Sequence, residues 1–167
     1  RVSENGRMGH AYAVPYERTG LVIINVQAHL AWALAAKCGY QVDRKAWDLS
    51  MVEIRKSIGP NTGALGYSSR VPDYPDIPAR TGAMATALAI TGEEPKMAKG
   101  FANALVKYQA RMRHAHSMTS IGLIYGMAGI KSVNPEAHGA VMKKWIPYLE
   151  LCRTSVGTAA YFGGKRN

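Results

Sequence analysis

The chain of 167 residues is long enough for one domain with a sizeable core, and its 47% hydrophobic and 19% charged residues exclude an intrinsically disordered protein. Its formal net charge of +10 favours acidic partners such as nucleic acid, anionic lipid headgroups or an acidic polysaccharide. Because no run of five or more basic residues occurs, the same charge is also typical of Lys and Arg that simply solvate the outer faces of helices.

Cofactor, compartment and membrane signals are weak. Cys38 and Cys152 lack the spacing of a metal-binding motif, so we expect no metal and no cofactor. The longest apolar stretch, 21–38, is interrupted by polar residues, whereas a membrane span needs about 18 uninterrupted apolar residues. No signal peptide is visible, but the first residue is not Met. We therefore expect a soluble piece of a longer chain, which leaves an exported bacterial protein as one option.

The N-terminal third predicts an irregular segment and two helices. Residues 1–17 lack helical periodicity and predict an irregular lead-in. Residues 21–38 predict an apolar first helix that Gly39 ends. Asp43 is suited to cap a second helix that continues to about Ile58. The apolar residues of this helix recur at helical spacing along one face: Trp47, Met51, Ile54 and Ile58.

The middle of the chain predicts a long loop and two further helices. Residues 61–79 predict the loop, because Gly and Pro are spread through it, and loops of this length usually have a function or cover an opening. The apolar segment Arg80–Ile90 predicts the third helix, which ends near Gly92. Pro95 suits the first turn of a fourth helix. Its apolar stripe is expected at Met97, Phe101, Leu105, Tyr108 and Met112.

The last third predicts two helices and a connector. Residues 113–116 lead into a fifth helix, Ser117–Ile130, that is apolar nearly all round. Asn134 and Pro135 suit the start of a sixth helix that continues to about Cys152 and should be kinked by Pro147. The Gly-rich residues 154–167 are typical of a connector. Three glycines of the fifth helix should allow a neighbouring helix to come close: Gly122, Gly126 and Gly129.

The alternation of helix types predicts an all-α fold. The first, third and fifth helices are apolar all round and so should be buried on all sides, whereas the others are amphipathic. Thr81 and Thr119 are 38 residues apart, and Pro95 and Pro135 are 40 apart, which is a solenoid-like period. We expect residues 1–167 to form a single domain of three antiparallel helical hairpins in two layers, inner apolar and outer amphipathic.

Three features support a resemblance that extends from about Tyr12 to the C-terminus. Gly66-Tyr67 precedes Arg80-Thr81-Gly82, His114–His116 leads into the next apolar helix, and the tail Tyr161–Gly164 looks like the start of another repeat. This pattern resembles the α/α toroid of terpenoid cyclases, protein prenyltransferase β subunits, the complement thioester domain and several polysaccharide lyases. The nearest resemblance is to an uncharacterised bacterial family built of such repeats.

The chain departs from these enzymes in their functional motifs. It has no Asp-rich acid box, no Asp-x-Cys zinc pair and no Gly-Cys-Gly-Glu-Gln thioester run. Three hairpins are also too few to close a ring. The resemblance therefore implies a partial toroid, which is an open arc, a fragment or one part of an assembly.

The resemblance also implies where a site would lie. In toroids, the loops that lead into the inner helices line one mouth of the central cavity, and the helix N-termini there favour an anion. The candidate catalytic residues at this mouth are Tyr67, Arg80, His114 and His116. The candidate ligand-binding residues are His10, Tyr12, Arg18 and Arg113.

The first functional hypothesis is a non-catalytic helical-repeat module that binds a ligand or partner at this mouth. The partner would be an anionic ligand or polysaccharide, another protein, or further copies of the chain that complete the ring. The second hypothesis is a polysaccharide lyase or another glycan-processing enzyme. In that case Arg80 or Arg113 would neutralise a uronate carboxylate. A histidine, His114 or His116, would take the α proton, and Tyr67 would protonate the leaving oxygen.

Three alternatives compete with these hypotheses. The arginines would serve structure alone if they held carbonyls or a carboxylate at helix starts, with the histidines capping turns. A metal site at His114-x-His116 lacks a third ligand nearby in the sequence. Nucleic-acid binding is the least favoured partner class, because we find no aromatic residue among the basic residues of the fourth helix: Lys96, Lys99, Lys107 and Arg111.

Overall fold

The computed structural model describes residues 2–9, 20–73, 77–117 and 119–153, with the backbone alone for 114–117, 119 and 120. Over these residues the fold is all-α, as predicted, and the loop between the second and third helices holds two isolated β-bridges. The helices are α1 (Val22–Lys37), α2 (Arg44–Lys56), α3 (Pro78–Thr91), α4 (Pro95–Lys107), the 3₁₀ helix η2 (Gln109–Ser117), α5 (Thr119–Val133) and α6 (Pro135–Cys152).

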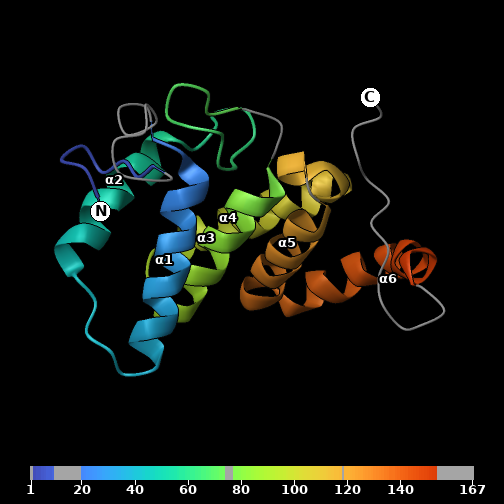
Figure 1. The fold of residues 1–167 in the computed structure, drawn as a ribbon. Helices are drawn as coiled ribbons and strands as arrows, with labels where there is room; N and C mark the ends of the chain where they lie inside the picture. The colour runs from blue at the N-terminus through green and yellow to red at the C-terminus, as the bar shows by residue number, and fades with distance from the viewer. Residues whose placement is uncertain (1, 10–19, 74–76, 118, 154–167) are drawn as a thin grey trace.

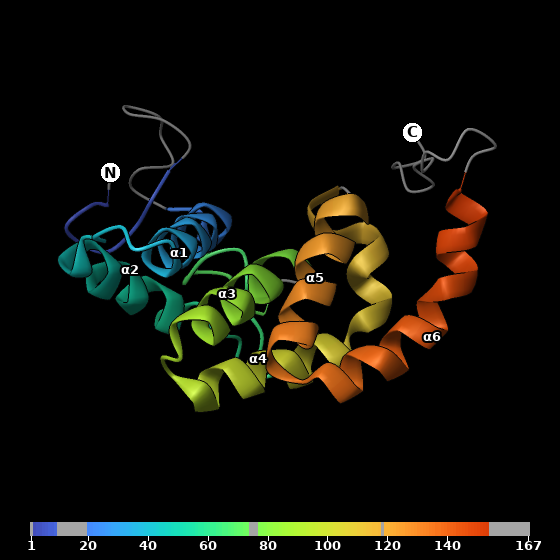
Figure 2. The same cartoon turned by 90° about the horizontal axis from the view of Figure 1, so that it is seen from below.

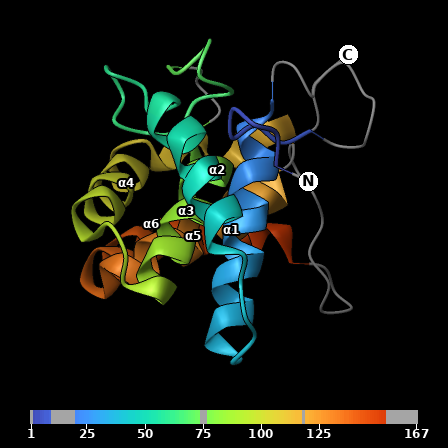
Figure 3. The same cartoon turned by 90° about the vertical axis from the view of Figure 1, so that its left-hand side faces the viewer.

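Helix α3 is the centre of the arrangement. It packs against α1 on one side and α5 on the other, so these three helices lie side by side (Figure 1). Helix α4 packs against both α3 and α5. Helix α2 contacts α1 and runs in the opposite direction to it (Figure 3), and α6 contacts α5. That this row of helices forms a partial toroid stays a prediction.

Among the described helices, α3 has the largest share of buried residues. Ten of its 14 residues are buried, and its buried part begins at the first residue, Pro78. The expectation that the first and fifth helices are also buried on all sides is wrong for this chain, because Leu34 of α1 is 48% exposed and Ile124 of α5 is 65% exposed. The reason is their position: among the described helices, α1 and α5 each have α3 on one side and no equivalent apolar helix on the other.

Glycines set the distance between α3 and α5. A Cβ atom added to Gly82 of α3 would lie 2.0 Å from the carbonyl oxygen of Tyr125 in α5. In the reverse direction, a Cβ atom on Gly129 would lie 2.8 Å from the Cα atom of Gly82. Two of the three glycines predicted to permit a close approach, Gly126 and Gly129, do face near neighbours. The two backbones are therefore in direct contact, which no larger residue would permit.

Several helix boundaries follow from local chemistry. The carboxylate of Asp43 caps α2 by accepting a hydrogen bond from the Ala46 N–H at 3.1 Å, and Asn134 caps α6 in the same way through the Ala137 N–H at 3.0 Å. Helix α3 starts at Pro78, two residues before the predicted start, because Pro needs no hydrogen-bond acceptor in the first turn.

The end of the fourth helix and the start of the fifth differ from the prediction. Helix α4 ends at Lys107, and residues 109–117 continue as η2 instead of an α-helix. The amide of Arg111 donates to the carbonyl of Tyr108 at 2.9 Å, which is the three-residue spacing of a 3₁₀ turn. Met112 still reaches the core. Helix α5 accordingly runs Thr119–Val133 rather than 117–130.

Helix α6 changes direction along its length and leads away from the bundle (Figure 2). It contains Pro147, which lacks the N–H of a regular helix and crowds the carbonyl four residues earlier. The bend agrees with the kink that the sequence predicts. Val141 and Trp145 are buried on the first part of the helix and hold it to the core.

The glycine contact between α3 and α5 can be tested by a pair of substitutions. We expect Gly82→Ala to lower the free energy of unfolding by about 3 kcal/mol or more, because the new methyl group must push two backbones apart. Gly100→Ala in α4 is the control, since an added Cβ there meets nothing within 4 Å and should stabilise the helix by about 0.5–1 kcal/mol. Chemical denaturation of both variants measures the difference. Equal changes in the free energy of unfolding in the two variants would show that stability does not depend on the close approach of α3 and α5.

Candidate functional site

The structure describes the side chains of three of the eight predicted site residues: Tyr67, Arg80 and Arg113. The other five lie outside the described residues or, for two of them, outside the described side chains: His10, Tyr12, Arg18, His114 and His116. The three that can be placed fall into two separate clusters, on the loop before α3 and on the surface between η2 and α6.

The first cluster joins Tyr67 and Arg80. The guanidinium carbon of Arg80 lies 5.6 Å from the centroid of the Tyr67 ring, within the range of a cation–π contact. Arg80 is 0% exposed. The loop that carries Tyr67 covers this end of α3, and its Leu65 N–H donates to the Thr81 hydroxyl at 3.0 Å. A polymer could therefore reach Arg80 only after the loop had moved.

The same loop occupies the start of α1. The carbonyl of Tyr67 accepts a hydrogen bond from the Val22 N–H at 3.2 Å, so a donor that an anion would use is already engaged. The first part of the chain adds a second such contact, because the Leu21 N–H donates to the Met8 carbonyl at 2.9 Å. Over the described residues, the starts of α1 and α3 are thus filled by the chain itself.

The second cluster contains Arg113, which is exposed in the middle of η2. Its guanidinium carbon lies 5.4 Å from the ring centroid of Tyr148 and 5.8 Å from that of Trp145, both on α6. The two rings meet edge to face, with centroids 5.3 Å apart. Trp145 is buried, so it fixes this aromatic pair to the core.

A similar arrangement at the start of η2 was missed by the sequence analysis. The Nζ atom of Lys107 and the guanidinium carbon of Arg111 each lie 5.0 Å from the centroid of the Tyr108 ring. The expectation that no aromatic residue accompanies the basic residues of the fourth helix is therefore wrong. The sequence predicts Tyr108 on the buried stripe of the fourth helix, and its side chain is half-buried. Because α4 ends one residue before it, the 3₁₀ turn also places it beside Arg111.

Charges are segregated along the described chain. Residues 95–113 contain five basic side chains and no acidic one: Lys96, Lys99, Lys107, Arg111 and Arg113. The two acidic residues just before this stretch are paired with α2, Glu93 with Arg44 and Glu94 with Arg55. We call α4 and η2, with these five cations and Tyr108, the basic face.

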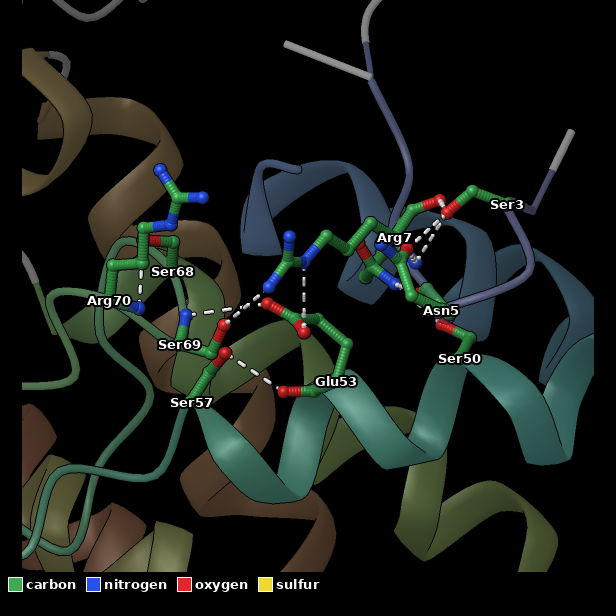
Figure 4. Close-up of polar contacts among 11 residues, drawn as sticks. Ser3, Asn5, Arg7, Ser50, Glu53, Ser57, Ser68, Ser69 and Arg70 are labelled. Atoms are coloured by element: carbon green, nitrogen blue, oxygen red, sulfur yellow. Dashed lines mark hydrogen bonds and ion pairs between the residues drawn. The ribbon is translucent and has the colours of Figure 1, made fainter. Parts of the chain in front are cut away.

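A network of polar contacts around Glu53 has a structural role. Figure 4 shows Glu53 of α2 between Arg7 and Ser69, with its carboxylate 3.3 Å from the Arg7 Nε atom and 3.3 Å from the Ser69 amide. Glu53 is 2% exposed. It therefore anchors the first residues and the loop before α3 to α2. Within the described residues, no three His, Cys, Asp or Glu side chains are placed to hold a metal ion.

A second buried group lies between α1 and α2. His29 is fully buried, its Nε2 atom is 3.0 Å from the Ser50 hydroxyl, and it meets the Trp47 ring edge-on with centroids 4.2 Å apart. Asn25 donates to the same hydroxyl at 2.7 Å. Because Ser50 is also fully buried, this Ser–His contact cannot act on a substrate and belongs to the packing of the core. Burial lowers the pKa of His29 to about 4.

This buried histidine predicts a pH dependence of stability. In the unfolded chain His29 takes up a proton near pH 6.5, whereas the folded protein does so only near pH 4, so between these values the unfolded state binds more protons. The free energy of unfolding should therefore fall by about 3 kcal/mol as the pH drops from 6.5 to 4. Urea titrations across this range measure the slope. His29→Gln should remove this part of the slope, and an unchanged slope in that variant would rule the assignment out.

The comparisons with known proteins give a family and no activity. A search of curated proteins and a search of solved structures each find no match. No helix in the described part of the chain has both the length and the apolar character of a membrane span. A family model described as a domain of unknown function, DUF6288, matches residues 1–167. The chain therefore belongs to the DUF6288 family.

Proposed function

We propose that this domain is a non-catalytic helical-repeat module that binds an anionic polymer, such as an acidic polysaccharide, on the basic face. The observation that supports it is the segregation of charge: α4 and η2 contribute five cations and no acid, and aromatic rings lie against three of those cations. A net charge of +10 raises the local concentration of polyanions around the whole chain. The basic face is the described stretch in which basic residues follow one another without an acidic residue between them in the sequence.

The position of η2 agrees with the predicted mouth, which would be lined by the segments that lead into the inner helices. The 3₁₀ helix η2 precedes α5, and Arg113 stands six positions before the first residue of α5 in the sequence. Of the predicted site, the part around α5 supports binding better than the parts around α1 and α3, whose starts are filled by the loop and the first residues. The proposed site is therefore the η2 side of the mouth.

A partial toroid is the architecture that we propose for the module. The row of α1, α3 and α5 with α2, α4 and α6 around it is the arrangement expected of such an arc. The two helices at the ends of this row leave apolar side chains exposed: Leu34 on α1 and Ile124 on α5. A protein partner or further copies of the chain that complete the ring would cover them.

Binding to polygalacturonate, a polymer of uronate units, tests the proposed function. We expect measurable affinity that falls as salt is added, because exposed charge pairs are screened. The double variant K107Q/R111Q should bind roughly three- to tenfold more weakly, given the modest energy of exposed ion pairs. The control K45Q/K56Q removes two exposed charges from α2 and should bind like the unmodified chain. Isothermal calorimetry measures the affinity of both variants. If both lost affinity equally, net charge alone would explain the binding.

The lyase hypothesis makes a different prediction. Arg80 is fully buried beneath the loop, so we expect no cleavage of polygalacturonate even on long incubation. The measurement is the ultraviolet absorbance of the unsaturated product of β-elimination. If the absorbance rose steadily with the unmodified chain and did not rise with the variant Tyr67→Phe, the lyase hypothesis would replace that of a binding module.

A further inference from the structure

We infer that the pocket bounded by the end of α3, one face of α4 and the end of α5 is a site for a medium-chain carboxylic acid, with the alkyl chain against its apolar wall and the carboxylate at Lys99. Its volume of about 540 Å³ is in the range of small-molecule sites. The inference goes beyond the proposed function, because the ligand is a small molecule and not a polymer. Of the five cations of the basic face, Lys99 alone lines this pocket.

The pocket lies where two junctions between helices come together. Residues 92–94 connect α3 to α4, and Asn134 connects α5 to α6. Both junctions line the pocket, the first through Gly92 and Glu93 and the second through Asn134. Because α3, α4 and α5 pack against one another, helices of the core fix its walls, and a ligand would find it already formed.

One wall of the pocket is apolar and aliphatic. Leu88 of α3 and Ala98 and Ala102 of α4 are all buried, and Pro95 and Val133 add further aliphatic groups. No aromatic residue is among the described residues that line the pocket, so a sugar ring or a flat aromatic ligand would find no ring to stack on. An alkyl chain needs only apolar surface, and this wall provides it.

Polar side chains stand beside this wall. Lys99 and Asn103 are four residues apart in α4, so they lie on the same face of the helix, and Ser132 adds a hydroxyl group from the end of α5. Within the described part of the chain, none of these three side chains has a hydrogen bond or an ion pair. Three groups that can donate hydrogen bonds are therefore open to a ligand.

The charges around the pocket favour one negative group on the ligand. Glu93 is the only acidic residue among the described lining residues, and both oxygens of its carboxylate accept hydrogen bonds from the Arg44 guanidinium. The charge of Glu93 is thus balanced within the protein, whereas that of Lys99 is not. A carboxylate supplies the single charge that is missing. A phosphate group brings three oxygens and about two charges, which is more than one ammonium group balances.

A comparison of octanoate with octanamide tests the role of the carboxylate, because the two differ in charge and share the alkyl chain. Calorimetry at low salt should show that octanoate binds roughly three- to tenfold more tightly, as expected of an exposed ion pair. Lys99→Gln should bring octanoate to the affinity of octanamide and leave octanamide unchanged. The control Lys143→Gln removes an exposed charge from α6 outside the pocket and should keep the preference for octanoate.

A second pair of variants tests the location. Ala89 lines the pocket and is half-buried, so Ala89→Leu should fill part of the space and weaken both ligands by about tenfold or more. Ala140→Leu adds the same atoms at an exposed position of α6 outside the pocket and should bind both ligands as the unmodified chain does. Thermal melts of all four variants check that each one folds.

The outcomes separate this inference from the proposed function. Equal affinity of the unmodified chain for octanoate and octanamide would overturn the carboxylate assignment, and full affinity in Ala89→Leu would overturn the location. If octanoate does not bind at millimolar concentration, the whole inference fails, while the polygalacturonate titration still decides the proposed function. If octanoate binds as expected and polygalacturonate does not bind, the proposed function fails and the assignment of the pocket stands.

Discussion

The close contact between α3 and α5 is the constraint on which the rest of the structure depends. Gly82 and Gly129 let two backbones meet without intervening side chains, and α1 then covers the opposite side of α3. With α3 enclosed in this way, α4 can bridge α3 and α5, and η2 follows along α5. The position of the basic face is therefore a consequence of how near α3 and α5 approach each other.

Much of the fold could be predicted because its signals are local. The cap at Asp43, the cap at Asn134 and the prolines in the first turns of α4 and α6 each act within a few residues, and the structure has all of them. Burial of whole helices is a different property, since it depends on neighbours. The apolar character of α5 predicts a buried helix, but Ile124 is exposed because the described chain supplies an equivalent neighbour on one side only.

The candidate site was harder to predict because it depends on contacts between elements. The sequence predicts that Tyr67, in the loop before the third helix, and Arg80, at the start of that helix, lie at the same site, and the two side chains do meet. Only the structure shows that Arg80 is buried. The support of Arg113 by α6 joins residues more than thirty positions apart, which no local pattern reveals. The sequence Lys107-Tyr108 followed by Arg111 did contain a signal, a ring three residues before an arginine. It was overlooked because an α-helix was assumed to continue through it.

Pro147 affects more than the course of α6, because it lies next to the aromatic pair beside Arg113. It stands between Trp145 and Tyr148 in the sequence of α6, in a helix that visibly turns away from the bundle (Figure 2). The perpendicular setting of the two rings under Arg113 thus arises within a helix that is not straight. Substitution of this proline would therefore change how the rings of Trp145 and Tyr148 are oriented beside Arg113.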